Sequence, residues 1–515
     1  MYIVRMPKYE NTICDDKMTF NECELAILRH AVDEGETRQG EMVAKNEDVK
    51  KIIGILENFL KMKRVICYGG TAINNILPKD DQFYNKEIEV PDYDFYSNSA
   101  MDHAIELANI YNKNGYTEVE AKAGVHHGTY KVYVNFLPIA DITQLHSMIF
   151  DELYKESIKI AGIHYASPDF LRMGMFLELS RPNGDVSRWE KVHKRLILLN
   201  KHYPPKAITK CDNVEFQRRM NRDPKKGAVI KKDKMTIEAI EAEVFTIVRD
   251  ELASQGAVFF GGYACGLYSK HMNENEKQEL AKIPDFDVIV ENADRVALII
   301  KEQLEQSGYT KIELVEHAAI GEIVPRHIEI RIGKESIAFL YDPIACHNYN
   351  KIRIGNDMDI NVATIDTILT FYLAFMYTDK IYYYKDRLSC LAEYLYDLQE
   401  DNRLNQRGLL KRFSMDCIGK QPTMEDIRAE KAQKYAELSS KKGSRTYDEW
   451  FLNYKPGSDK KMGKTPSETQ LFNTKNIIKS PKPMSKKMSK TRFIAKTVRR
   501  KKAKPKAKPK NEYLI

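Results

Sequence analysis

The feature that most constrains the fold of this chain is an internal repeat, in which a strand ends in Gly-Gly and Asp-x-Asp follows. The two copies read Tyr68-Gly69-Gly70-Thr71 with Pro91-Asp92-Tyr93-Asp94, and Phe260-Gly261-Gly262-Tyr263 with Pro284-Asp285-Phe286-Asp287. The glycine pairs are 192 residues apart and the aspartates 193, and a Gly-Tyr-Thr motif at position 115 recurs at 308. Because solenoid repeats are only roughly 20 to 50 residues long, this spacing indicates a duplicated domain.

The duplication also predicts how the chain divides. A later landmark, 167–171, recurs at 364–368 with an offset of 197, so the second copy carries a few inserted residues. Helical segments and short alternating strands together predict an α+β fold of tandem duplicated domains with mixed sheets and flanking helices. We expect these segments: an N-terminal helical extension (1–45), the first copy (46–202), a linker (203–235), the second copy with C-terminal helices (236–412), a helix with loops (413–474) and a disordered basic tail (475–515).

The composition is typical of a soluble protein with two or three domains, because 43% of the 515 residues are hydrophobic and 30% are charged. No apolar stretch reaches the length of a membrane span, and the N-terminus has no signal-peptide core. We therefore expect neither membrane insertion nor secretion. The eight cysteines form no Cys-x-x-Cys pair, from which we expect free thiols in a reducing compartment.

Positive charge is concentrated near the C-terminus. Residues 475–510 contain sixteen Lys or Arg and no Asp or Glu, so the rest of the chain carries a net charge of −8 although the whole carries +8. Such a composition predicts disorder. Three roles are open for this tail: attraction to nucleic acid, a localisation signal, or solubility alone.

Three acids of the first copy have the order expected of a metal site. Asp92 and Asp94 are two residues apart on an expected strand, so their side chains share one face at about 7 Å. Two such carboxylates repel each other unless cations lie between them, and Mg²⁺ and Mn²⁺ both accept oxygen ligands. A two-metal phosphoryl-transfer site usually takes a third carboxylate from a neighbouring strand. Asp141 is our candidate, at the end of a strand that we expect to run on from Lys131.

The Gly-Gly turn supplies the phosphate-binding end of the same site. Gly69 and Gly70 let backbone N–H groups approach a triphosphate, the following helix directs its positive end there, and the Thr71 hydroxyl can add a hydrogen bond. Further along, Arg188, Lys191 and Arg195 share one face of an expected helix and could neutralise phosphates. A basic helix that simply faces solvent would show the same spacing.

This ordered set resembles the DNA polymerase β-like nucleotidyltransferase superfamily. More narrowly, 68–72, 91–95 and 180–182 are similar to the poly(A) polymerase catalytic subunit of large DNA viruses, of the poxvirus and giant-virus type, and the resemblance extends over most of 45–410. It implies a polymerase β-like palm in each copy, with Asp92, Asp94 and Asp141 as metal ligands and with triphosphate contacts from Gly70 and Thr71. It also implies template-independent addition of AMP from ATP to an RNA 3′-hydroxyl, with release of pyrophosphate.

The second copy keeps part of this set. Gly261, Gly262, Asp285 and Asp287 are retained, but Tyr263 replaces the threonine. The third acid is open between two residues, Glu329 and Asp342. Since the resemblance implies a C-terminal domain without catalysis, we predict a structural or RNA-binding pseudo-domain.

The function that we predict is a poly(A) polymerase acting on viral mRNA through two divalent cations, Mg²⁺ or Mn²⁺. The alternatives are tRNA CCA addition, small-molecule nucleotidylation, and an RNA-binding scaffold without catalysis. Expected partners are an RNA 3′ end and ATP, and either a second copy of the chain or a cap-methyltransferase subunit that confers processivity. The resemblance places such an enzyme in the host cytoplasm, at the viral factory, and in the virion.

Overall fold

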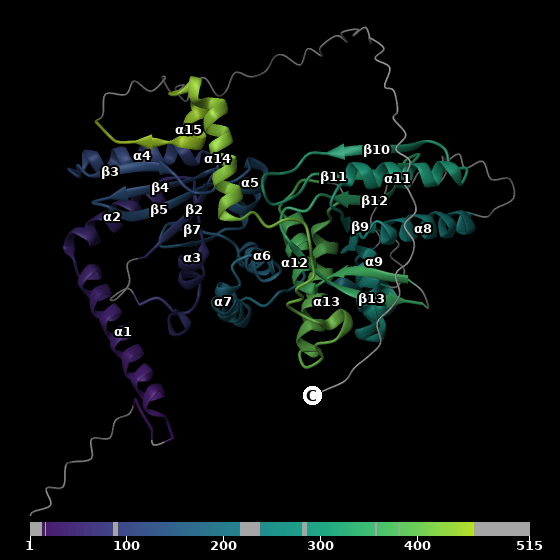
Figure 1. Ribbon diagram of the computed structural model, residues 1–515, viewed down its shortest axis with the longest axis horizontal. Helices are drawn as coiled ribbons and strands as arrows, with labels where there is room; N and C mark the ends of the chain where they lie inside the picture. The colour runs from purple at the N-terminus through teal and green to yellow at the C-terminus, as the bar shows by residue number, and fades with distance from the viewer. Residues whose placement is uncertain are drawn as a thin grey trace, which may run out of the picture. The chain divides into compact units, whose positions relative to one another are not determined.

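The computed structural model describes residues 13–15, 17–85, 91–216, 237–280, 286–355, 358–380 and 382–457. All of these belong to one compact unit, Met1–Lys461. Most of the expected linker, Asp285 and the whole of the expected basic tail lie outside the described residues. Two mixed sheets organise the unit, one built mainly from the purple-to-blue first half of the chain and one from the teal-to-green second half (Figure 1).

The first sheet has the order β16-β3-β4-β5-β2-β1-β7-β6. Within it β2 is parallel to β5 and β1 is parallel to β7, whereas the other pairs are antiparallel. The strands are β1 (Ile66–Tyr68), β2 (Tyr93–Ser97), β3 (Val119–Ala123), β4 (Thr129–Val134), β5 (Leu137–Gln144), β6 (Ile158–Ile160), β7 (Ile163–Tyr165) and β16 (Asn453–Tyr454).

The second sheet has the order β10-β11-β12-β9-β8-β14-β13-β15, which repeats the first except that β16 and β15 are added at opposite edges. The parallel pairs recur as β12 with β9 and β14 with β8, and a register shift between β11 and β12 matches the one between β4 and β5. The strands are β8 (Val258–Phe259), β9 (Phe286–Ile289), β10 (Ile312–His317), β11 (His327–Ile332), β12 (Glu335–Tyr341), β13 (His347–Ile354), β14 (Met358–Ala363) and β15 (Cys417–Ile418). The predicted α+β class with tandem domains is confirmed.

Five helices of each half correspond as well, in the same order along the chain. The pairs are α2 (Glu47–Met62) with α8 (Ile237–Ser254), α3 (Gly69–Ile76) with α9 (Gly262–Tyr268), α4 (Ala100–Lys113) with α11 (Ala293–Gln306), α6 (Pro168–Leu179) with α12 (Ile365–Phe375), and α7 (Trp189–His202) with α13 (Lys385–Asp401). Ser167 and Thr364 occupy the N-cap positions of α6 and α12, so the offset of 197 residues continues into these helices. Helix α5 (Ser147–Glu156) belongs to the first half and α10 (Glu274–Leu280) to the second.

The apolar periodicity that predicted a helix before the first Gly-Gly strand explains how that helix packs. Val49, Ile52, Leu56, Phe59 and Leu60 of α2 are all buried. Side chains three and four positions apart share one helical face, and burying each of them stabilises the fold by about 1.5–3 kcal/mol. The face therefore holds α2 in the core against β7 and α4.

The chain returns to the first sheet after it has completed the second. Helices α14 (Met424–Leu438) and α15 (Arg445–Phe451) lie beside β3 and α4 (Figure 1), and β16 pairs with β3. The Tyr130 hydroxyl donates to the Glu449 carbonyl at 3.0 Å, and Arg445 forms an ion pair with Asp102 at 2.9 Å. This return covers a strand that would otherwise be an open sheet edge.

The cysteines differ from the expectation of free thiols. Disulfides join Cys14 to Cys23, Cys211 to Cys390 and Cys346 to Cys417, whereas Cys67 and Cys265 are free and buried. Two of the bridges join positions 179 and 71 residues apart, so no local spacing could reveal them.

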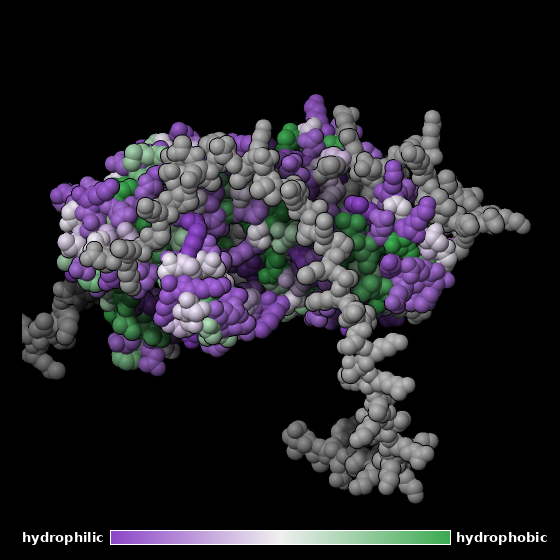
Figure 2. Space-filling model, turned by 90° about the horizontal axis from the view of Figure 1, so that it is seen from above, coloured by the Kyte–Doolittle hydropathy of each residue, from purple (hydrophilic) through white to green (hydrophobic). Residues whose placement is uncertain are grey.

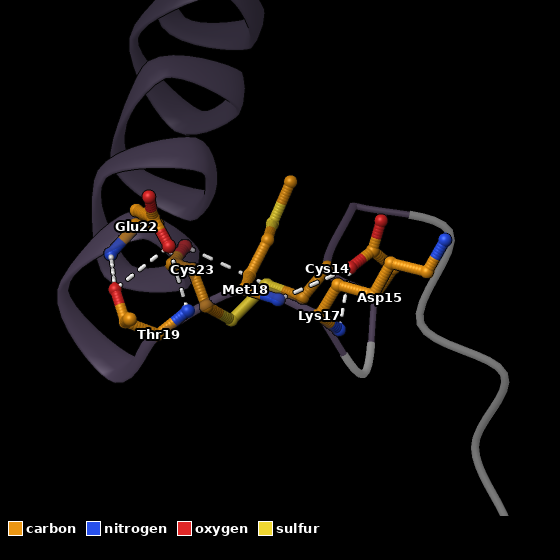
Figure 3. Close-up of a disulfide and its surroundings, with 7 residues drawn as sticks. All are labelled: Cys14, Asp15, Lys17, Met18, Thr19, Glu22 and Cys23. Carbon is orange, nitrogen blue, oxygen red and sulfur yellow. Dashed lines mark hydrogen bonds between the residues drawn. A yellow bond between two sulfur atoms is a disulfide. The ribbon is translucent and has the colours of Figure 1, made fainter.

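The first disulfide lies where α1 (Phe20–Ala44) begins (Figure 3). Asp15 accepts hydrogen bonds from the backbone N–H groups of Lys17 and Met18, at 2.8 and 3.1 Å. Glu22 accepts from the backbone N–H and the hydroxyl of Thr19, at 2.7 and 2.8 Å. These bonds satisfy donors at the helix start, and α1 lies within the expected N-terminal helical extension.

The face of the molecule that Figure 2 shows is largely polar. Figure 2 shows hydrophilic side chains over most of the described part of one face, with hydrophobic ones in several separate areas. Among the described residues, no helix combines the length and the apolar character needed to cross a bilayer.

Candidate active site

The three acids of the first copy meet on two neighbouring strands. Asp92 immediately precedes β2, Asp94 lies within it, and the Cα partner of Asp94 on β5 is Asp141. The expected single strand from Lys131 to Asp141 is wrong, because Asn135 and Phe136 adopt φ values of 50° and 66° and turn the chain into a β4–β5 hairpin. The hairpin is what brings Asp141 beside Asp94.

The acids make this place strongly negative. Burial, with the nearby Asp92 and Asp141 carboxylates, raises the pKa of Asp94 to about 7. Burial and Asp141 also raise the pKa of Asp92. Lys131 Nζ, on the neighbouring β4, forms an ion pair with Asp141 Oδ2 at 2.5 Å.

A donor set of three carboxylates matches Mg²⁺ and Mn²⁺ chemically. Lys131 already brings a positive charge to Asp141, which is what a cation would do there. Among the described residues, no three His, Cys, Asp or Glu side chains converge closely enough to ligate one ion as they stand. The acids therefore fit divalent cations by their chemistry and by their positions on neighbouring strands, and ligation of one ion by all three requires their side chains to move.

Both glycines of the first Gly-Gly turn are required by close contacts. Gly69 has φ of +72°, and a Cβ there would lie 2.6 Å from Asp94 Oδ2. A Cβ on Gly70 would lie 2.5 Å from the Tyr84 hydroxyl and 3.0 Å from the Arg195 guanidinium. The turn thus lets the acid and the arginine approach the backbone at the start of α3.

Arg195 is held in this place by two aromatic residues. Its Nη2 donates to the Tyr84 hydroxyl at 2.7 Å, and its guanidinium lies 5.1 Å from the centre of the Phe83 ring. The backbone N–H groups of Phe83 and Tyr84 both donate to Asn74 Oδ1 at 2.8 Å. A cation is therefore fixed beside the positive end of α3, where an anion binds favourably.

Thr71 has a different contact from the expected one. Its hydroxyl donates to the Asp92 carbonyl at 2.5 Å, and the side chain is buried. The proton is thus used to hold the segment that carries the acids. A direct bond from this hydroxyl to a triphosphate stays a prediction.

The predicted basic residues line one cavity with two of the acids, Asp92 and Asp94. Its volume is about 410 Å³, and every residue that lines it belongs to the first half of the chain. The polar lining comprises Gly69, Gly70, Thr71, Tyr84, Asp92, Asp94, Glu178, Arg188, Lys191 and Arg195. The remaining lining comprises Tyr68, Ile73, Tyr96, Phe170, Leu171, Met173, Gly174, Met175 and Val192.

The second copy does not rebuild the acid cluster. The Cα partner of Asp287 on β12 is Phe339, which therefore takes the position of Asp141. Neither acid that we considered lies there: Glu329 is on β11, opposite Phe339, and Asp342 follows the end of β12 and pairs with Arg326 at 3.0 Å. Asp285 lies outside the described residues.

The Gly-Gly turn of the second copy has lost its phosphate-binding surroundings. A Cβ on Gly261 would collide with Asp287, so this glycine still admits the acid, and α9 begins at Gly262. Tyr263 packs among aromatic rings, with its centre 5.0 Å from Phe259 and 5.4 Å from Phe286. It therefore fills core space.

Several residues of the cavity were missed in the sequence. Tyr84 and Phe83 position the arginine, Glu178 pairs with Arg188 at 3.2 Å, and Gly174 lies in the middle of α6. The glycine was the one detectable signal, because an isolated glycine in a helix usually has a packing or functional reason.

The fold and this site, a mixed sheet with a Gly-Gly turn and strand-borne acids, are similar to those of nucleotidyltransferases. Residues 54–185 match the family model for the poly(A) polymerase catalytic subunit, which confirms the resemblance seen in the sequence. The crystal structure of the Megavirus polyadenylate synthase has a similar fold, with a TM-score of 0.69 and 17% sequence identity over 88% of both chains.

Two curated relatives are similar to this chain over the same region. One is "Putative poly(A) polymerase catalytic subunit" of Acanthamoeba polyphaga mimivirus, 32% identical over 160 residues, which are 30% of this chain and 27% of that protein. The other, of the same name, is from African swine fever virus (isolate Pig/Kenya/KEN-50/1950) and is 29% identical over 167 residues, 31% of this chain and 35% of that protein. The matched region thus spans only about a third of these relatives.

Proposed function

We propose that this chain is a template-independent poly(A) polymerase that transfers AMP from ATP to the 3′ end of viral mRNA. The observation that carries the proposal is the register of Asp94 with Asp141 beside the Gly69-Gly70 turn. It lies within the residues that match the family model. The alternatives of CCA addition and of a non-catalytic RNA-binding scaffold are decided by the experiment below.

In the proposed reaction the RNA 3′-oxygen forms a bond to the α-phosphorus of ATP. The bond from the α-phosphorus to the oxygen that bridges to the β-phosphorus breaks, pyrophosphate leaves, and the hydroxyl proton passes to solvent. Asp92, Asp94 and Asp141 would hold two divalent cations, Mg²⁺ or Mn²⁺. When bound, these cations activate the attacking hydroxyl and neutralise the developing charge on the phosphates.

The other side chains of the cavity act on the triphosphate. Arg195 and the backbone N–H groups at the start of α3 bind its phosphates, and Tyr84 keeps the guanidinium in place. Lys191 and Arg188 add positive charge along the same cavity. Fixed charges of this kind stabilise the transition state without reorganising during the reaction.

The second half is proposed to be a non-catalytic domain. Phe339 stands where a third carboxylate is needed, and a phenyl ring cannot ligate a cation. The domain would support the first half and offer surface to RNA. A second copy of the chain or a methyltransferase subunit would supply processivity, and the proposed place of action is the viral factory in the host cytoplasm, with packaging into the virion.

The experiment is extension of an end-labelled RNA primer with Mg²⁺ and each NTP separately, by the wild type and by Asp92→Ala/Asp94→Ala. Long ladders with ATP alone, abolished in the double variant, are expected. One to three additions with CTP and ATP would instead establish CCA addition. Extension that persists in the double variant would overturn the assignment of the site, and no extension with any NTP would favour the scaffold.

A further inference from the structure

The apolar wall of the cavity is one face of α6, and it contains an unusual opening. Gly174 is exposed in the middle of a helix whose neighbouring residues Met173 and Met175 are buried. No atom lies within 4 Å of the place where a Cβ would be. Close packing therefore does not explain this glycine, although glycine weakens a helix relative to alanine. What the absent side chain provides is space in the cavity.

The second half shows what occupies this space when no ligand is needed. The offset that relates the caps Ser167 and Thr364 places Phe371 of α12 at the position of Gly174. The Phe371 ring is buried and stacks on Phe260, with ring centres 4.6 Å apart. Phe260 itself corresponds to Tyr68, which lines the cavity in the first half. An aromatic ring thus lies, in the second half, where the first half has open space.

The two helices differ in the same way at a second position. One helical turn further on, Glu178 of α6 corresponds to Phe375 of α12. Phe375 stacks on Tyr383 at 4.0 Å and lies 5.6 Å from Tyr341. Glu178 instead lines the cavity, and Arg188 Nε lies 3.2 Å from its Oε1. The first half therefore presents a hydrogen-bond acceptor at the edge of the space that Gly174 leaves.

We propose that this face of α6 is a nucleobase subsite, in which Gly174 makes room for the ring and Glu178 accepts a hydrogen bond from its exocyclic amino group. The proposal rests on the nucleotidyl transfer proposed above and adds the part of the substrate that is recognised. Adenine and cytosine carry such an amino group, whereas guanine and uracil present a carbonyl oxygen at the corresponding ring position. A carboxylate repels that oxygen, so the subsite selects ATP, and CTP if ring size is not read, against GTP and UTP.

The test measures binding without RNA, so it does not depend on chain extension. Dissociation constants for ATP, CTP, GTP and inorganic tripolyphosphate are determined with Mg²⁺ for the wild type, Gly174→Leu and Glu178→Gln. Gly54→Leu is the matched control, because Gly54 is also a helix glycine with nothing within 4 Å of its Cβ position and does not line the cavity. Melting temperatures verify that all variants are folded.

We expect Gly174→Leu to weaken ATP binding by about tenfold or more and to leave tripolyphosphate within about twofold, since only the base loses its place. Glu178→Gln should reduce the preference for ATP over GTP by about tenfold. Gly54→Leu should change the affinity for neither ATP nor tripolyphosphate. Equal wild-type affinity for ATP and CTP supports recognition of the amino group alone, and tighter ATP supports a purine subsite.

Two results would overturn the subsite: unchanged ATP affinity in Gly174→Leu, or an equal loss of ATP and tripolyphosphate. A wild type that binds GTP as tightly as ATP would also overturn the role of Glu178. If the variants change nucleotide affinity as expected but the protein extends no RNA, the proposed polymerase activity is wrong and the nucleobase subsite is still supported.

Discussion

The two halves of this chain have the same strand order and the same helix order, but they use the space beside the acid-bearing strand differently. In the first half Asp94 faces Asp141 across the sheet, and α6 leaves a cavity at Gly174. In the second half Asp287 faces Phe339, and α12 brings Phe371 into the corresponding space. A duplicated fold can thus keep its topology while one copy exchanges a charged, open site for an aromatic core.

The largest effect should follow from giving the first half the residue of the second. Asp141→Phe removes the third carboxylate and should lower the rate of RNA extension about 10³-fold, which is roughly 4 kcal/mol of transition-state stabilisation. The reverse change, Phe339→Asp, should create no activity in the second half, because aromatic side chains fill the space beside it. Primer extension measures the rate for both variants. Each variant is also combined with Asp94→Asn, which inactivates the first site. Activity created by Phe339→Asp would break the comparison.

Truncation of the ring that fills the second half should be the next largest effect. Phe371→Ala should lower the free energy of unfolding by roughly 3–5 kcal/mol, because it removes a buried phenyl ring and leaves a void. Gly174→Ala should raise it by up to about 1 kcal/mol through its helix propensity. Denaturant titrations of both variants measure the difference. Equal effects would mean that the two helices do not differ in packing.

Two aspartates at the same helical position form ion pairs that differ between the halves. Asp169 and Asp366 correspond, but in the first half the arginine partner is buried (Arg172, 1% exposed), whereas in the second the aspartate is (Asp366, 0% exposed). Arg412→Met leaves a buried carboxylate without its cation, 2.9 Å away in the wild type, and should destabilise by roughly 3 kcal/mol. Arg172→Met removes the buried charge itself and should cost only about 1 kcal/mol. Thermal unfolding of both variants measures the two losses of stability. A larger loss in Arg172→Met than in Arg412→Met would contradict the burial argument.

The smallest effect concerns Glu329, which lies opposite Phe339 as Lys131 lies opposite Asp141. Burial alone would raise the pKa of Glu329, but hydrogen bonds from His317, Arg331 and Ser336 outweigh it and lower the pKa to about 2. Because the folded pKa lies below the ordinary value, the stabilisation is complete above about pH 5 and is lost as the pH falls toward about 2.

Glu329→Gln should therefore destabilise by about 2 kcal/mol at pH 7 and by progressively less toward pH 3. Denaturant titrations at pH 7, 5 and 4 measure this change, with Glu335→Gln, at a half-buried position of β12, as the control. A difference between wild type and variant that does not vary with pH would show that the carboxylate charge is not what stabilises the strand pair.

Much of the first site was visible in the sequence, because its signals are local. Asp92 and Asp94 are neighbours on one strand, and Gly69 and Gly70 stand directly before a helix. Asp141 was found by its order in the motif, although the hairpin that delivers it depends on left-handed backbone at two residues without glycine. The disulfides could not be found, since two of them join cysteines 179 and 71 residues apart.

The second site was harder to interpret for a physical reason. A choice of third acid there requires the pairing register of β12 with β9, and a register shift between β11 and β12 moves side chains relative to a simple count along the chain. The sequence offered Glu329 and Asp342 because they are acids on or after the two expected strands, whereas the sheet places Phe339 beside Asp287.

The sequence by itself determined the duplication, the α+β class and the polar parts of the first site, because glycine turns, alternation and paired acids are short-range patterns. Only the tertiary structure decided which half keeps a cavity. That outcome depends on side chains that are more than a hundred residues apart, such as Phe371 against Phe260, and on the absence of a side chain at Gly174. Packing between distant segments depends on three-dimensional register, which no local spacing records.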